Sequence, residues 1–276
     1  PNNEVQGITT NTSRVAIHGF FNQYQGNPVP RFVVLQLNGS PDPTFTPPTE
    51  PFISVRDFKL MPNNKLYLVG NFTTYNGQTV NRIVRLNPNG SIDTTFATGS
   101  GLNSLATKLT VQADGKVLVS GSFSTFNGTP VSQLVRIHPN GSLDTTFNPS
   151  FPSLASVLVA AVDTQGRVYV HGSNQGFLFF QRLLPDGSED LSFNVGTGFN
   201  GNLTDVDLQS NQKIIVTGNF TMYQGVSSAR IARLLSDSCL PATPPVIQTQ
   251  NQYLNCPGDA TILYVNQPPN NNSTHW

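Results

Sequence analysis

The chain has 276 residues, a formal net charge of zero and only 11 % charged residues. Such a sequence has no basic surface to neutralise a phosphate backbone, so we expect no binding of nucleic acid. No apolar run approaches the ~18 residues of a membrane-spanning helix, and we expect no membrane span. Asn, Thr, Ser and Gln supply most of the polar residues, a composition that is common in secreted and cell-surface proteins.

One sequence pattern recurs through the first 237 residues. It reads Val-x-Gly-x-Phe, then Asn-Gly, then Arg-Leu-x-x-Asn-Gly-Ser-x-Asp-x-x-Phe. The first glycine recurs in steps of 51, 51, 51 and 46 residues, at Gly19, Gly70, Gly121, Gly172 and Gly218. A period near 50 indicates an array of supersecondary units, none of which buries its apolar face alone. The repeats are expected at about 1–51, 52–102, 103–153, 154–199 and 200–237.

The second repeat shows what one unit contains. Its apolar and polar residues alternate in short segments, separated by turns rich in Asn and Gly. Alternation with a period of two predicts β-strands, and Asn-Gly suits the positive φ angles of tight hairpin turns. Four strands are expected in this repeat, at residues 52–61, 65–72, 80–86 and 92–96.

Four antiparallel strands per repeat are the content of one β-propeller blade. The sequence therefore predicts an all-β fold, a closed or nearly closed β-propeller of five four-stranded repeats of ~51 residues. An open β-solenoid is the alternative, although its coils are usually shorter and carry fewer hairpin turns. The recurring glycine is expected at a bulge or a close backbone approach. The closing phenylalanine of each repeat, for example Phe96, is expected in the core.

The fourth repeat is five residues short. It lacks the Tyr-Asn-Gly loop and instead runs Gly-Ser-Asn-Gln-Gly-Phe-Leu-Phe-Phe from Gly172 to Phe180. Repeat folds tolerate a deletion that is confined to a turn, so we expect the flanking strands to keep their register.

Two charged columns, meaning equivalent positions in successive repeats, run through the array. Arginine occupies one column at Arg85, Arg136, Arg182 and Arg233, with Val34 in the first repeat. Aspartate occupies the other at Asp42, Asp93, Asp144 and Asp190. We expect one structural ion pair or turn-capping bond per blade. The alternative is a ring of charge that faces a ligand, and packing can replace an ion pair in the repeat that lacks the arginine.

An aromatic column precedes the Asn-Gly or Gln-Gly turn, at Tyr24, Tyr75, Phe126 and Tyr223. These rings would form a sugar-binding platform if they were exposed. They would be packing residues between blades if they were buried.

The sequence offers no candidate catalytic residue and no metal-ligand set. His18 and His171 share a column with Val69, Ser120 and Thr217, which suits an ordinary strand position. The segment Asp186–Asp190 resembles a calcium loop only faintly, because it is the repeat's own Gly-Ser-x-Asp turn and lacks alternating acidic ligands. We therefore expect a protein that is not an enzyme and needs neither metal nor cofactor.

The repeat, including Asn-Arg-Ile-Val-Arg-Leu-Asn-Pro-Asn-Gly-Ser-Ile-Asp-Thr-Thr-Phe in the second unit, resembles the delta-60 repeat family. The resemblance covers residues 1–237. It implies a β-propeller of a large bacterial surface or secreted protein, and it carries no catalytic residues. On this basis we expect an exported, non-catalytic propeller that acts as an adhesion, interaction or spacer module. A carbohydrate-binding propeller is the alternative.

The sequence changes character after residue 237. Residues 238–245 form a proline-rich linker, and residues 246–276 resemble the first strands of an Ig-like module, with Cys256 followed by Trp276. Such modules occur in surface adhesins of gliding bacteria and other cargo of the type 9 secretion system. The resemblance implies that Cys256 pairs with a cysteine on a later strand and that the chain is a piece of a longer protein. A bridge from Cys239 to Cys256 is the alternative.

Two Asp-Thr-Thr triplets match a short O-glycosylation pattern of the same bacteria, which makes Thr94 and Thr145 candidate acceptors. The alternative is that the triplets only build the repeat's turn. The expected partners are other domains of the same polypeptide, with secretion or surface machinery or a glycan as further candidates.

Overall fold

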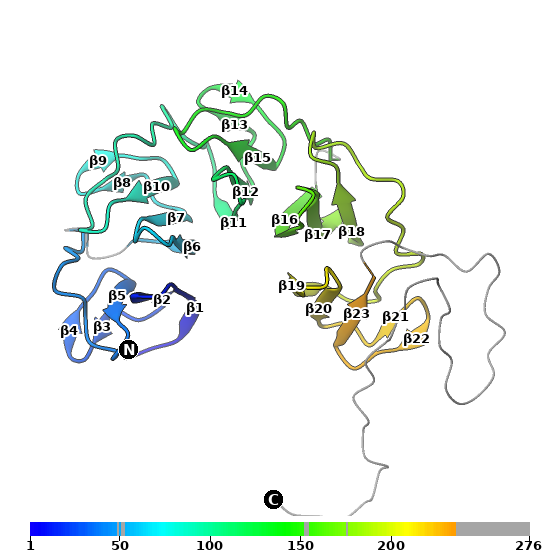
Figure 1. Cartoon of the computed structure of the whole chain (residues 1–276), viewed down its shortest axis with the longest axis horizontal. Helices are drawn as coiled ribbons and strands as arrows, with labels where there is room; N and C mark the ends of the chain where they lie inside the picture. Colours follow the sequence, from blue (N-terminus) through cyan, green and yellow to red (C-terminus); the bar gives the residue numbers. More distant parts are fainter. Residues whose placement is uncertain (49, 51–52, 152–154, 175, 236–276) are drawn as a thin grey trace, which may run out of the picture.

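The computed structural model describes residues 1–48, 50, 53–151, 155–174 and 176–235. Within them the regular elements are all β-strands, which form five three-stranded antiparallel sheets around an open arc and four two-stranded hairpins (Figure 1). We call these sheets blades one to five. The proline-rich linker, the Ig-like segment, Cys239 and Cys256 lie outside the described residues.

The blades share one topology, with the second strand in the centre of the sheet. Blade one contains β1 (Val5–Thr10), β2 (Arg14–Gly19) and β5 (Phe32–Gln36). Blade two contains β6 (Val55–Leu60), β7 (Leu66–Gly70) and β10 (Ile83–Leu86). Blade three contains β11 (Ala106–Val111), β12 (Val117–Gly121) and β15 (Leu134–Ile137). Blade four contains β16 (Ala155–Val162), β17 (Val168–Asn174) and β18 (Phe177–Leu183). Blade five contains β19 (Leu203–Leu208), β20 (Ile214–Gly218) and β23 (Ile231–Leu234).

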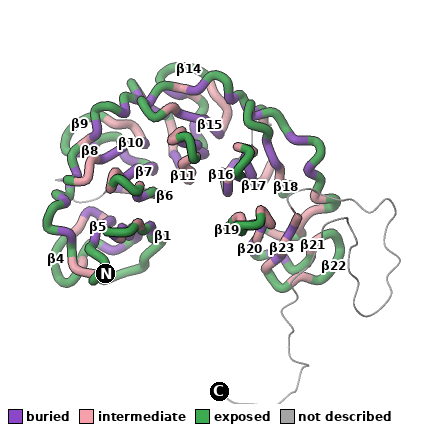
Figure 2. The backbone as a smooth tube through the Cα atoms, viewed as in Figure 1, coloured by how far each residue is buried: buried purple, intermediate pink, exposed green. Residues whose placement is uncertain are grey.

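Four blades carry a small hairpin between their second and third strands. The hairpins are β3 (Gln23–Tyr24) with β4 (Asn27–Pro28), β8 (Thr74–Tyr75) with β9 (Gln78–Thr79), β13 (Thr125–Phe126) with β14 (Thr129–Pro130), and β21 (Met222–Tyr223) with β22 (Val226–Ser227). Their outer strands are exposed, as Figure 2 shows for β4 and β22. Blade four has no such hairpin, because β17 pairs directly with β18 from Asn174 and Phe177 onward.

The predicted fourth strand does not form. In each of the first four repeats the segment after the Asn-Gly or Asp-Gly turn makes only a single bridge, such as Leu86 with Ile92. The chain then turns at the aspartate column, where the Asp93 carboxylate accepts hydrogen bonds from the backbone N–H and the hydroxyl of Thr95. A side chain that bonds its own backbone two residues later favours a turn over a ladder, so the strand stops after one residue pair.

The predicted ring is also not closed. The first strands β1, β6, β11, β16 and β19 line the inside of the arc, and each of the first four packs against the first strand of the next blade. Blades one and five stand at the two ends of the arc and face a gap (Figure 1).

The recurring glycine lies at the close approach that the sequence predicts. In blades one, two, three and five the first strand has a register shift beside it, for example between Val55 and Asp57 opposite Gly70. In blade four the shift lies further along the strand, between Val159 and Ala161. A Cβ at Gly70 would overlap the carbonyl oxygen of Ser54, which accepts a hydrogen bond from Asn71 N–H. Only glycine fits there.

The core lies between the blades. One apolar cluster joins Tyr67 and Phe96 of blade two to Leu109 and Val119 of blade three, and similar clusters join the other neighbouring blades. Phe96 is 6 % exposed, which confirms the core position of its column.

The five-residue deletion is confined to a turn, as predicted. Register is kept across it: Val168 pairs with Leu183 in blade four as Leu66 pairs with Leu86 in blade two.

Candidate binding site on the fourth blade

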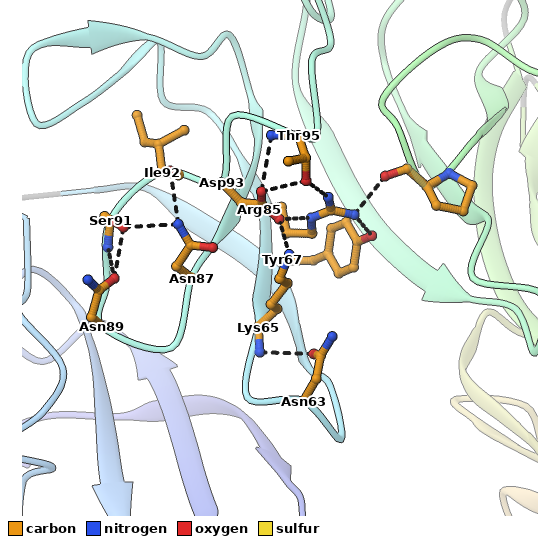
Figure 3. A network of polar contacts seen from close by, with 11 residues as sticks. Asn63, Lys65, Tyr67, Arg85, Asn87, Asn89, Ser91, Ile92, Asp93 and Thr95 are labelled. Carbon is orange, nitrogen blue, oxygen red and sulfur yellow. Dashed lines mark hydrogen bonds and ion pairs between the residues drawn. The ribbon is translucent and has the colours of Figure 1, made fainter.

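The arginine and aspartate columns form one buried ion pair in each of blades two, three and four. The Nε–Oδ2 distances are 2.5 Å for Arg85 and Asp93, 2.7 Å for Arg136 and Asp144, and 2.7 Å for Arg182 and Asp190. The guanidinium of Arg85 also donates to Thr95 Oγ1 and Tyr67 Oη (Figure 3). It lies over the ring of Phe96, 4.9 Å from the ring centroid.

The same arginines link one blade to the next. Arg85 Nη1 donates to the carbonyl of Pro139 in blade three at 2.7 Å, and Arg136 Nη1 donates to that of Pro185 in blade four at 2.7 Å. Both arginines are less than 10 % exposed. Their charges are therefore neutralised inside the array and do not form a ring that faces a ligand.

Blade one builds the same link from a different strand. Arg14 on β2 pairs with Asp42 at 2.6 Å, donates to Thr44 Oγ1 and reaches the carbonyl of Pro88 in blade two at 2.7 Å. Comparison within the arginine column missed this residue, because Val34 occupies that column. A signal was present, since Arg14 shares its own column with Lys65, whose Nζ lies 2.7 Å from Asp93 Oδ2.

These contacts keep the aspartates ionised. Burial by itself would raise the pKa of Asp93, but hydrogen bonds from Lys65, Thr95 and Arg85 outweigh burial and hold the pKa below its usual range. The pKa of Asp144 is lowered in the same way by Thr146, Arg136 and Lys116.

The aromatic column does not form an exposed platform. Tyr75 is fully buried and Phe126 is 1 % exposed, whereas Tyr24 and Tyr223 are half-buried. The hydroxyl of Tyr75 donates to the carbonyl of Gly90 at 2.9 Å. Burial raises the pKa of Tyr223 to about 12. The column fits packing residues rather than a row of sugar-stacking rings.

The candidate acceptor threonines have exposed side chains. Thr94 and Thr145 are the middle residues of their triplets, whereas the hydroxyls of Thr95 and Thr146 bond the preceding aspartates. The turn and the glycosylation hypothesis therefore involve different threonines of each triplet. In blade four the position of Thr94 is taken by Leu191, which is 83 % exposed.

The two histidines of one column are buried. Burial, with a smaller effect of Lys108, lowers the pKa of both His18 and His171 to about 4. Neither belongs to a cluster of metal-ligating side chains in the part of the chain that the structure describes.

The carboxylates of the suspected calcium loop bind different protein groups and do not form a cation site. Asp186 accepts from Ser188, whereas Asp190 binds Arg182. The described residues also contain no helix that could cross a membrane.

Blade four carries a hollow that the sequence did not predict. A cavity of about 370 Å³ lies along β18 and the segment that leads to β19. Its walls include the four rings Phe179, Phe180, Phe193 and Phe199. Gln181 Nε2 donates to Glu189 Oε1 at 2.7 Å, and both residues also line the cavity.

Exposed apolar side chains stand beside this cavity. Phe177 is 80 % exposed at the start of β18, Leu178 is 36 % exposed, and Leu191 belongs to the cavity wall. An aromatic cavity with the carboxylate of Glu189 and the amides of Gln181 and Asn194 suits binding of an apolar group that also offers a hydrogen-bond donor. The only sequence signal for this site was the deletion of the hairpin, which brings β17 and β18 together.

A model for a β-propeller domain of unknown function matches residues 13–45, 62–96, 112–147 and 209–238, which lie in repeats one, two, three and five. No curated protein matches the chain in sequence. The solved structures include a similar chain, from PorZ, which its title describes as an essential bacterial surface component of the type-IX secretion system of Porphyromonas gingivalis. That similarity covers 83 % of this chain and 31 % of PorZ, at 15 % identity and a TM-score of 0.37. The matched ranges follow the repeat, and over them the chain is similar to a β-propeller repeat family.

Proposed function

We propose that this chain is a non-catalytic β-propeller module of an exported bacterial cell-surface protein and that it contacts a partner through its fourth blade. One observation carries the proposal. The repeat that departs from the pattern is also the one that combines an aromatic cavity with the exposed side chains of Phe177 and Leu191.

The charged groups support a scaffold rather than an active site. The aspartate of the repeated column is bound to an arginine in blades one to four, so none of these four carboxylates is free to act as a general acid or base. Catalysis of glycoside hydrolysis, for instance, needs two carboxylates that flank one bond.

The surface location rests on composition and on the resemblance of the repeat. The composition rich in Asn, Thr, Ser and Gln suits an exported protein. The exposed Thr94 and Thr145 are candidate O-glycan acceptors of the module. In this proposal the neighbouring Ig-like segment and the propeller belong to one adhesin-like polypeptide, of the kind that gliding bacteria export through the type 9 secretion system.

A carbohydrate-binding propeller receives no comparable support. Tyr75 and Phe126, the middle members of the aromatic column, are buried.

The proposal is tested in the bacterium that encodes the protein. Phe177→Ser with Leu191→Thr removes the exposed apolar groups of blade four. Met222→Gln with Val226→Thr is the matched control, because those residues are 42 % and 44 % exposed on the hairpin of blade five. We expect antibody to label all three strains on intact cells, and only the blade-four variant to lose attachment to a surface under flow. Unchanged attachment of that variant, or labelling only after permeabilisation, would contradict the proposal.

A further inference from the structure

We infer that the side of blade one opposite blade two is a docking surface for another blade of the same repeat, joined in cis. We call this side the leading face. It corresponds to the side by which blades two to five contact the blade before them. Positions on this face of blade one differ from the equivalent positions of blades two to five.

Ile8 is the first such position. It pairs with Ile17 in β2. The equivalent residues of the other first strands are Phe58, Leu109, Val159 and Val206, and each pairs with the central strand of its blade. Ile8 is 67 % exposed, whereas these four equivalents are at most 7 % exposed. In blades two to five the preceding blade covers the column, and in blade one nothing among the described residues does.

The apolar clusters show the same contrast. The cluster around Phe58 contains Ala16, Phe32 and Phe45 of the preceding blade. The cluster on the leading face of blade one contains Ile17, Phe21, Val33 and Leu35, all of blade one itself. The leading face therefore presents one half of the core that joins two blades elsewhere.

Polar groups on the leading face specify what the other half must bring. The carbonyls of Pro88, Pro139 and Pro185 each accept an arginine N–H from the preceding blade. Asn89, Asn140 and Asp186 carbonyls each accept a backbone N–H from that blade. The equivalent carbonyls of Leu37 and Asn38 receive no such donor from the described residues. An incoming blade could satisfy the carbonyl of Leu37 with an arginine in the column of Arg85 and the carbonyl of Asn38 with the backbone N–H in the column of Ala97.

The turn glycine gives an independent indication. At Gly90 a Cβ would overlap Thr46 of the preceding blade, and at Gly141 it would overlap Ala97. At Gly39 the space is open apart from the hydroxyl of Tyr24, 4.0 Å away. The φ of +83° at Gly39 itself favours glycine, so the informative difference is the space around it. On the leading face no described residue of another blade approaches this turn, whereas in blades two and three the preceding blade lies against it.

Apolar side chains, an arginine and a backbone N–H at fixed spacing are the surface of one more blade of this array. The four existing junctions all join consecutive repeats of one polypeptide, so the inferred junction continues an interface already formed in the molecule. For this reason we commit to a blade in cis rather than to a second copy of the chain.

The test adds a probe blade of known sequence to the full chain. A copy of residues 52–102 is placed directly before Pro1, and the thermal midpoint Tm, the hydrogen exchange of β1 and the mass in solution are measured. We expect a monomer whose Tm rises by roughly 5 °C and whose β1 amides exchange at least tenfold more slowly than in the original chain.

Two variants keep the test decisive. Ile8→Asp should leave the Tm of the original chain within about 1 °C and abolish the gain in the extended chain. A probe blade with Arg85→Met and Phe96→Ser should give no gain. The inference is wrong if the extended chain gains nothing, if the altered probe works equally well, or if the original chain forms a dimer that Ile8→Asp disrupts. In the last case the occupant is a second copy.

Discussion

Blades two and four are held in the array by the same contacts and differ at their outer edge. Both contain the arginine–aspartate pair and a buried closing phenylalanine, and both lie between two neighbours. Blade two has a hairpin there with the buried Tyr75, whereas blade four has a cavity and the exposed Phe177. The contacts between blades therefore fix the fold, whereas the outer edge of a blade is free to vary. We place the function at this outer edge.

The largest expected effect tests the contacts between blades that blades two and four share. Phe96→Ala in blade two and Phe193→Ala in blade four should each lower the free energy of unfolding by about 3–5 kcal/mol, because each removes a buried ring between blades. Urea unfolding of the two variants measures this, with Leu191→Ala as an exposed control. A loss below about 1 kcal/mol in either variant would show that its ring is not part of the core.

The link between blades should be the next largest contribution. Arg136→Met removes the arginine from Asp144 and leaves this buried carboxylate with Lys116, Thr146 and, at 3.7 Å, His138. We expect a loss of about 3 kcal/mol. Adding Asp144→Leu should recover part of this loss, because a buried carboxylate that has lost its arginine is then removed. If the free energy of unfolding fell no more than it does when an exposed lysine is replaced, the ion pair would not hold the blades together.

The buried histidines should make stability depend on pH. Their folded-state pKa of about 4 lies below the unfolded value of 6.5, so the unfolded chain takes up protons first and stability falls from pH 6.5 towards pH 4. We expect about 1–2 kcal/mol for each histidine by pH 5. Burial raises the pKa of Asp57 despite Lys108 and Lys59, so this group gains stability on acidification and opposes part of the loss.

Replacing both histidines separates this effect from that of the carboxylates. His18→Val and His171→Thr use residues that other blades place in the same column, at Val69 and Thr217. The double variant should lose most of the slope between pH 6.5 and pH 5. The stability that the lowered pKa of Asp93 and Asp144 contributes is lost only below about pH 5, as these groups become protonated in the unfolded chain. An unchanged slope in urea titrations would show that the histidines titrate normally.

The smallest effect on stability belongs to the part that differs. Phe177→Ser with Leu191→Thr should change the free energy of unfolding by less than about 0.5 kcal/mol per site, because both side chains are exposed. A larger loss, measured by urea unfolding, would mean that these residues hold the blade and do not form a free binding surface.

Much of the fold could be predicted from the repeat. The glycine column, the closing phenylalanine and the arginine–aspartate pairs follow from one local pattern that occurs several times. The alternating sequence wrongly predicted a fourth strand, because side-chain hydrogen bonds such as that from Thr95 to Asp93 favour a turn at this position. The arginine column alone did not reveal the role of Arg14, since its guanidinium reaches Asp42 from a neighbouring strand and its own column is the one that contains Lys65.

The site was harder to predict than the fold. The cavity of blade four results from what is missing at a turn and from how β18 then lies against the next blade, and no single column records that. The buried positions of Tyr75 and Phe126 were one of two stated alternatives, and only the packing of the blades distinguishes them.

Native-state hydrogen exchange of the full chain tests most directly whether blade four is a complete blade with a free outer edge. We predict that the central strands β7, β12 and β17 exchange at similarly slow rates, because each is enclosed by the same contacts between blades. Exchange of β17 that is a hundredfold or more faster than that of β7 would contradict the account. Phe177 and Leu191 would then be exposed because the shortened blade is loose, and not because the array presents them to a partner.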